Sequence, residues 1–271
     1  MSFLEPAFMQ RALIAAVLVG MTAPAIGIFL VQRRLALMGD GIGHVALTGV
    51  ALGFLLGTAP VVTAVVLALI GAVAIELLRQ RGKTSGDVAL ALLFYGGIAG
   101  GVLLIGLAPG ASNASLISYL FGSIASVDRA DLIITALLCG GVLGVVTLYR
   151  RELFAVCHDE EVARVAGLPV RALNLVIAAT AAVTVTVAMR VVGLLLVSAL
   201  MVVPVATAQL WSRSFTRTML LSIVVGVTVS VGGLVTAFYV DVAPGATIVL
   251  CAIALFVVSF VATTVRSAAA R

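Results

Sequence analysis

The sequence predicts an all-α polytopic membrane protein with about nine transmembrane helices. Hydrophobic residues make up 63% of the chain and charged residues only 10%, whereas soluble domains contain roughly 25% charged residues. The 27 glycines suit membrane helices that pack closely against one another. These features predict a single transmembrane domain over residues 1–271, built as one helical bundle.

Apolar runs of sufficient length are separated by short polar turns or turns containing glycine and proline. Residues 116–124 are too few to cross a bilayer, so we expect a half helix or re-entrant segment there. Pro204 lies within a span and is expected to kink or break it. The expected spans are 8–31, 42–57, 61–78, 87–107, 132–148, 172–189, 191–210, 219–240 and 243–265.

The distribution of basic residues predicts the orientation of these spans. With the amino terminus outside and the carboxyl terminus in the cytoplasm, every Lys and Arg except Arg11, Arg129 and Arg190 falls on the inner side, as the positive-inside rule requires. We therefore expect a multi-pass protein of the plasma membrane. A label at Ser112 should react from outside, and a label at Ser85 only from inside.

A carboxylate and an imidazole lie four residues apart at the start of the second span. Side chains four apart share one face of a helix, so Asp40 and His44 can point at the same ion. A row of glycines beside them, at Gly49, Gly53 and Gly57, allows another helix to approach closely. Each residue also has a simpler interpretation, since Asp40 could be a helix N-cap and His44 a polar packing residue. The pair in register, within an apolar protein, favours a functional site.

The longest polar stretch, 150–171, contains a predicted short surface helix. Asp159 can cap its start and Gly167 can end it. Val162 and Val165 share one face, which makes the helix amphipathic. We interpret 157–161 as a loop leading into this capped helix rather than as a metal site.

Two other motifs are better explained without a ligand. Asp128 and Asp131 resemble a metal-binding carboxylate pair, but a capped start of the fifth span explains them. Residues 82–84 resemble the end of a phosphate-binding loop, yet Leu77 stands where that motif needs glycine and no strand precedes it. The chain is therefore not expected to hydrolyse ATP itself.

Four segments in the expected order resemble the permease subunits of zinc, manganese and iron ABC importers. Residues 33–49 (RRLALMGDGIGHVALTG) resemble the family signature "RRLSLMGDALSHAALPG". Residues 118–124 resemble the extracytoplasmic segment, 159–170 the cytoplasmic loop, and 192–204 the late broken span. Thr48 departs from the family pattern, which commonly has proline there, so we expect a more regular helix at this point.

The resemblance implies a helical bundle like that of the type II ABC importers. It also implies a homodimeric permease with two separate ATPase subunits and an extracytoplasmic metal-binding receptor. It implies that Asp40 and His44 take part in metal passage, and that the cytoplasmic loop docks on the ATPase. The residues assigned to docking are Asp159, Glu160, Glu161, Val162, Val165, Gly167 and Pro169.

The ligand chemistry of the pair agrees with the metals of that family. Imidazole with carboxylate suits zinc, manganese or iron(II), and the lack of a sulfur ligand argues against copper(I). We expect the metal to be cargo, with no permanently bound cofactor. Two alternatives remain, a secondary transporter driven by an ion gradient and, from another class, an intramembrane enzyme. The first would place several charges at mid-membrane depth, and the second would require a nucleophile beside a base.

Overall fold

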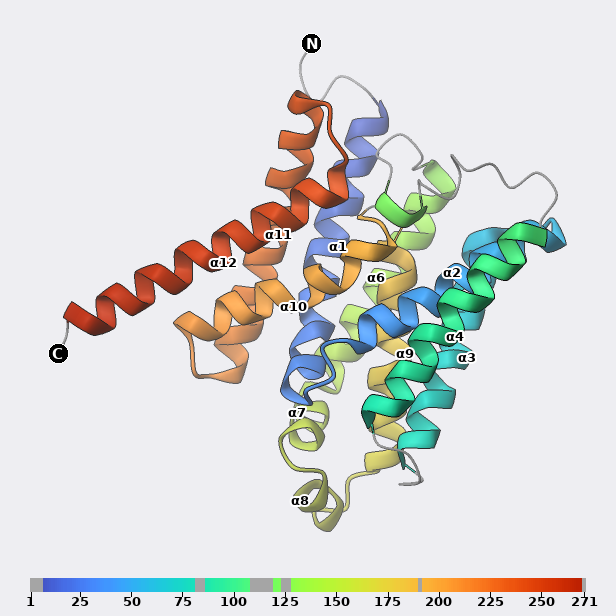
Figure 1. The fold of residues 1–271 in the computed structure, drawn as a ribbon. Coiled ribbons are helices and arrows are strands. Elements are labelled where there is room, and N and C mark those ends of the chain that lie inside the picture. The colour runs from blue at the N-terminus through green and yellow to red at the C-terminus, as the bar shows by residue number, and fades with distance from the viewer. Residues whose placement is uncertain (1–6, 81–85, 108–118, 123–127, 190–191, 270–271) are drawn as a thin grey trace.

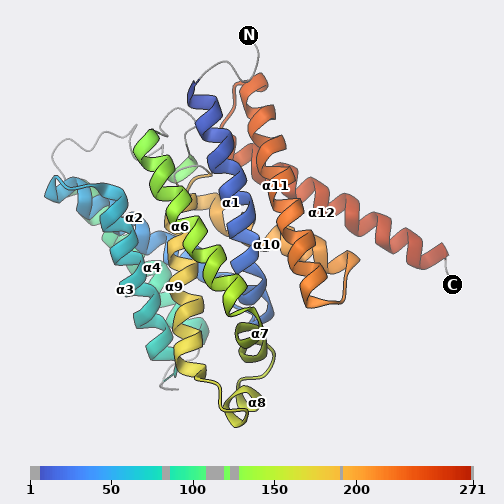
Figure 2. The same cartoon turned by 180° about the vertical axis from the view of Figure 1, so that it is seen from behind.

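In the part of the chain that it describes, the computed structural model is a helical bundle. The helix that begins at Ala7 starts at one end of it, and the short helix Glu160–Val165 lies at the opposite end (Figure 1; seen from behind in Figure 2). The structure describes residues 7–80, 86–107, 119–122, 128–189 and 192–269. The helices are α1 (Ala7–Gln32), α2 (Met38–Leu56), α3 (Pro60–Gln80), α4 (Gly86–Leu107), α6 (Arg129–Leu148), α7 (Arg150–His158), α8 (Glu160–Val165), α9 (Val170–Ala188), α10 (Leu194–Trp211), α11 (Phe215–Val240) and α12 (Pro244–Ala269).

Each of the nine predicted spans corresponds to one of these helices. Eight of the described helices are long and apolar enough to cross a membrane, namely α1, α2, α3, α4, α6, α9, α11 and α12. The remaining predicted span, the seventh along the chain, is α10, whose apolar part, Leu196–Trp211, is shorter. The all-α membrane architecture predicted from composition is therefore confirmed.

Helices α1 and α9 form the centre of the bundle. Their apolar segments are the most deeply buried of the eight helices that are long enough to cross a membrane. Small residues such as Ala15 and Ala181 and large ones such as Phe29 and Ile177 fill this centre together. In contrast, α12 extends obliquely away from the bundle (Figure 1) and has many exposed apolar side chains. Such a surface suits lipid or another membrane protein, because neither requires polar side chains.

Close helix packing follows the predicted glycine positions. A Cβ atom added at Gly49 would lie 2.6 Å from the Ala64 Cα atom of α3, and one at Gly53 would lie 2.7 Å from the Pro60 Cα atom. The third glycine of the row, Gly57, instead ends α2 with a left-handed φ of 63°. The prediction of close approach is thus confirmed for the first two glycines.

The cap predicted at the start of the fifth span is present, but one helix in the polar stretch after that span was not predicted. Asp128 and Asp131 form a capping box at the start of α6, with Asp131 N donating to Asp128 Oδ1 over 2.7 Å. However, the stretch expected to be a loop before Asp159 is helix α7. Leu153 and Val156, three residues apart, are both 1% exposed, so α7 forms because it buries one apolar side.

The expected break at Pro204 is not present, because α10 continues through it to Trp211. The interruption lies earlier, between α9 and α10, next to Gly193 with its φ of 90°. Of the half helix expected over 116–124, only 119–122 are described, with one helical turn at 119–121. The phosphate-loop-like residues 82–84 and both label positions, Ser85 and Ser112, lie outside the described residues.

Candidate functional site

The first turn of α2 places Asp40 against α10. The N-cap position of α2 is occupied by Leu37, without a side-chain cap, so the interpretation of Asp40 as the N-cap is wrong. Its carboxylate oxygen Oδ1 instead accepts a hydrogen bond from the Ser198 hydroxyl of α10. A membrane carboxylate is therefore anchored by a helix 158 residues away in sequence.

His44 lies one turn further along the same face of α2 and contacts α4. Its ring packs edge-on against Phe94, with ring centroids 4.5 Å apart and an interplanar angle of 77°. Its Nδ1 atom is buried and has no hydrogen-bond partner within the described part of the chain. An imidazole nitrogen of this kind is free to bind a metal ion in its neutral form.

Backbone contacts fix α2 closely at this point. A Cβ atom added at Gly97 of α4 would lie 2.7 Å from the His44 carbonyl carbon, so only glycine fits there. The Thr48 hydroxyl donates to the Gly97 carbonyl over 2.7 Å. Helix α2 is unbroken through Thr48, the position where the family commonly has proline. On the other side, Gly39 faces Ser198.

An apolar cavity of about 310 Å³ lies beside this face, between the start of α2 and α4. Its lining includes Leu37 and Tyr95, which are 69% and 70% exposed. Among the described residues, no group of three or more His, Cys, Asp or Glu side chains could hold a metal ion. One copy of the chain therefore offers two ionisable side chains at this face, Asp40 and His44.

The second predicted site, helix α8, has the caps expected from its sequence. Asp159 Oδ1 accepts from the backbone N–H groups of Glu161 and Val162, over 2.8 and 3.0 Å. At the other end Gly167 adopts a φ of 83°. The N–H of Leu168 then bonds to the Ala163 carbonyl over 3.0 Å, which is the Schellman arrangement.

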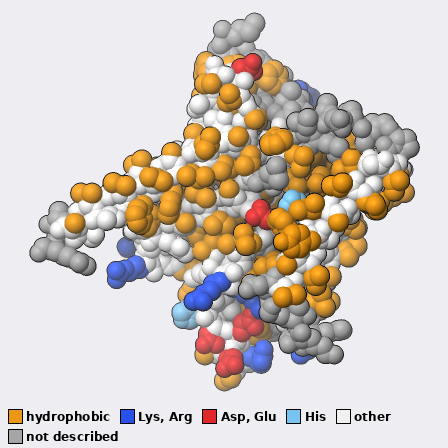
Figure 3. All heavy atoms as spheres, in the orientation of Figure 1, with side chains coloured by type: hydrophobic (Ala, Val, Ile, Leu, Met, Phe, Trp, Pro, Cys, Tyr) orange, Lys and Arg blue, Asp and Glu red, His pale blue; other side chains and the backbone are white. Residues whose placement is uncertain are grey.

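Helix α8 turns two different faces to its surroundings. Val162 and Val165 are 65% and 89% exposed, while Ala163 is 2% exposed. Glu161 is exposed, whereas Glu160 points inward to the membrane helices. Pro169 occupies the N-cap position of α9. Charged side chains gather around this end of the molecule, while most of the remaining surface in that view is hydrophobic (Figure 3).

The sequence did not indicate which distant side chains complete these sites. Ser198 and Phe94 lie in apolar runs and share no local pattern with Asp40 or His44. Glu76, near the end of α3, accepts two hydrogen bonds of 2.9 Å from Arg79. The partners of Glu160 were not anticipated, because they come from three other helices.

Comparison with known protein families gives a match along nearly the whole chain. The model of the ABC 3 transport family matches residues 5–263. The match includes both Asp40 and the α8 loop.

Individual relatives and a solved structure agree with the family match. The chain is 34% identical to the manganese import system permease protein ScaB of Streptococcus parasanguinis, covering 93% of this chain and 90% of that one. It is 30% identical to the high-affinity zinc uptake system membrane protein ZnuB of Haemophilus influenzae, covering 92% and 95%. The structure of PsaBC from Streptococcus pneumoniae in complex with Fab superposes with a TM-score of 0.82 at 35% identity, covering 94% and 92%.

Proposed function

Because the chain belongs to the ABC 3 transport family, we propose that Asp40 and His44 form the metal-passage site of a permease subunit. The protein is the membrane permease of an ABC importer for a divalent transition metal. The observation that carries the proposal is the buried Nδ1 atom of His44, which has no hydrogen-bond partner among the described residues and lies one turn from a carboxylate on the same face. The metal is cargo, so it must bind well enough to enter and weakly enough to leave.

The ligand set supports zinc, manganese or iron(II) as cargo. Carboxylate oxygen and imidazole nitrogen are donors that these ions accept, and sulfur donors for copper(I) are missing from the pair. A second copy of the chain, related by a two-fold axis, would add another Asp40 and another His44. The exposed apolar side chains of Leu37 and Tyr95 beside the pair support a homodimer with this face turned toward its axis.

The remaining parts of the transporter are proposed from the same family membership. ATP hydrolysis belongs to two separate ATPase subunits, which dock on the α8 loop through Val162 and Val165. An extracytoplasmic receptor delivers the metal from the opposite side. The chain acts as one permease domain in the plasma membrane, with its amino terminus outside and its carboxyl terminus in the cytoplasm.

Transport by the assembled protein tests this function directly. In vesicles containing the permease, an ATPase subunit and a receptor, we expect uptake of radioactive Mn²⁺ or Zn²⁺ that requires internal ATP. Collapse of the ion gradients with ionophores should leave uptake in place. Uptake that follows the gradient and ignores ATP would instead establish a secondary transporter.

Topology is tested by single cysteines placed at exposed positions, with Cys139, Cys157 and Cys251 replaced first. A cysteine at Asp241, in the turn between α11 and α12, should react with an impermeant maleimide in intact cells. A cysteine at Glu161, on α8, should react only after the membrane is opened. The reversed pattern would contradict the proposed orientation.

A further inference from the structure

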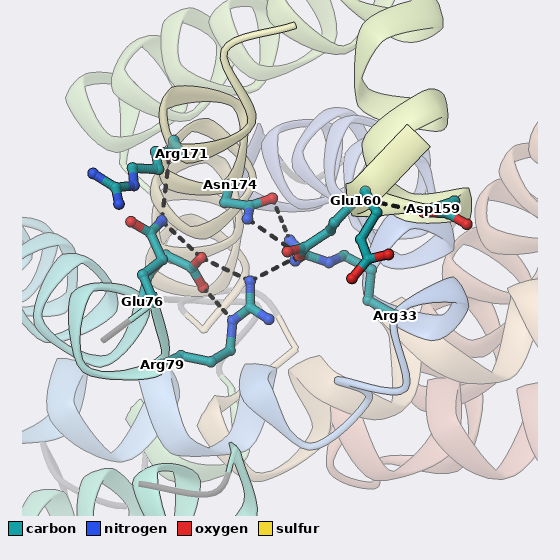
Figure 4. A network of polar contacts seen from close by, with 9 residues as sticks. Arg33, Glu76, Arg79, Asp159, Glu160, Arg171 and Asn174 are labelled. Carbon is teal, nitrogen blue, oxygen red and sulfur yellow. Dashed lines mark hydrogen bonds and ion pairs between the residues drawn. The ribbon is translucent and has the colours of Figure 1, made fainter. Parts of the chain in front are cut away.

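A single carboxylate oxygen connects helix α8 to three membrane helices. Glu160 Oε1 accepts from the Arg33 guanidinium, which follows α1, from Arg79 of α3 over 3.1 Å, and from Asn174 of α9 over 3.2 Å. Figure 4 shows these side chains converging on Glu160 from different elements. The partners are 127, 81 and 14 residues away in sequence, so the contact depends on the tertiary fold.

The charges around this oxygen are balanced pairwise. Arg79 is held by Glu76, whose side chain is 2% exposed, through two hydrogen bonds. The Arg33 side chain is 6% exposed, and it donates to Glu160 and, over 2.8 Å, to the side-chain oxygen Oδ1 of Asn174. A buried guanidinium strongly favours an ionised partner. Glu160 is consequently the carboxylate that satisfies Arg33.

Arg33 is also the start of the connection to Asp40. It follows the last residue of α1 directly, and the chain then turns through Arg34, which has a left-handed φ of 58°. Three backbone hydrogen bonds hold the turn, including Leu35 N to Leu30 O over 2.8 Å. Helix α2 begins at Met38, so Asp40 lies in the turn of helix that this tight connection leads into.

We propose that Glu160, Arg33 and Arg79 form an ionic linkage that transmits movement of α8 to the start of α2. This inference rests on the proposed function, in which the ATPase subunit moves α8. Val162 and Val165 face outward on α8 and Glu160 faces inward, so one short helix contacts the ATPase and the membrane helices at once. Glu160 is a positioning residue, since it acts on the metal-passage site through Arg33 and α2.

The test separates coupling from assembly by measuring uptake and ATP hydrolysis in the same vesicles. Glu160→Gln and Arg33→Gln are introduced singly and together into the complete transporter with its ATPase and receptor. We expect each single variant to retain the ATPase subunit and hydrolyse ATP, while the Mn²⁺ imported per ATP falls about tenfold, a typical size for coupling between sites. The double variant should be no worse than either single one, because both remove the same linkage.

The matched control is Arg171→Gln, which makes the same change as Arg33→Gln at an exposed arginine whose side chain points away from Glu160 (Figure 4). It should leave the ratio of uptake to hydrolysis unchanged. If Glu160→Gln leaves that ratio unchanged, or if the two single effects add in the double variant, the linkage is overturned.

If Glu160→Gln does not assemble with the ATPase subunit, Arg33→Lys tests the ionic linkage instead. Arg33→Lys keeps the charge but loses the planar fork that reaches both Glu160 and Asn174, so the uptake ratio must still fall. An unchanged ratio there overturns the proposal. Failure of the proposed function would look different, because the parent transporter itself would then import no metal, or would be indifferent to Asp40→Asn.

Discussion

Replacing Asp40 with asparagine or His44 with alanine should lower metal uptake by roughly 100-fold or more, because losing only an outer partner of a metal ligand already costs about 10–100-fold. Asparagine keeps the shape of the side chain but removes the charge that attracts a divalent ion. Alanine removes the unpartnered Nδ1 atom entirely. The measurement is initial uptake of radioactive Mn²⁺ and Zn²⁺ by vesicles containing the complete transporter.

Assembly of the same variants distinguishes metal passage from a structural role. Both should insert in the membrane at parental levels and co-purify with the ATPase subunit. Ser198→Ala is the matched control, because it removes the hydrogen bond to Asp40 and leaves both proposed ligands in place. Its uptake should fall much less. Parental uptake by Asp40→Asn and His44→Ala would reduce the pair to packing residues.

Mild acid should weaken metal binding by Asp40 and His44 without breaking the ion pairs of Glu160 on α8. A metal binds neutral imidazole, so protonation of His44 in mildly acidic solution should weaken binding. At Glu160, burial raises the pKa, but Arg33 and Arg79 outweigh it and hold the pKa below the usual glutamate range. The Glu160 ion pairs therefore form above that lowered pKa and are lost only as the pH falls through it. Mild acidity should reduce uptake while ATPase co-purification stays unchanged.

Local sequence patterns predicted most of the fold because the physics of membrane helices is local. An apolar run must satisfy its backbone hydrogen bonds internally, so its length and composition suffice to identify it as a helix. The caps at Asp128 and Asp159 were predictable for the same reason, since their partners lie within three residues. Helix α7 was not predicted because it lies in a polar stretch, where two buried side chains, Leu153 and Val156, are too few to give a clear apolar pattern.

The sites were predictable only in part, because their partners are distant in sequence. The spacing of Asp40 and His44 is a property of one helix and could be read directly. The hydrogen bond from Ser198 to Asp40, and that from Arg33 to Glu160, join residues 158 and 127 positions apart. No periodicity relates such residues, so the anchoring of Asp40 and the inward direction of Glu160 required the tertiary structure.

The second large effect is expected on helix α8, where replacing Val162 and Val165 with aspartate should release the ATPase subunit. These valines are mostly exposed. Exposed apolar side chains on a polar loop are typical of a surface that binds a protein partner. Burial of one valine contributes about 1.5–3 kcal/mol. Loss of two should therefore weaken docking by about 100-fold or more, since 1.4 kcal/mol is tenfold.

Co-purification of a tagged ATPase subunit with the permease measures this effect. The control is the pair Val162→Leu and Val165→Leu, which keeps the surface apolar and should retain the partner. The aspartate variant should still insert normally, because neither valine is in the buried core and the two residues that cap the helix, Asp159 and Gly167, are untouched. Since Glu160 would still hold α8 against Arg33, loss of the ATPase could not be attributed to a displaced helix. Undiminished co-purification with the aspartate variant would exclude this face as the docking surface.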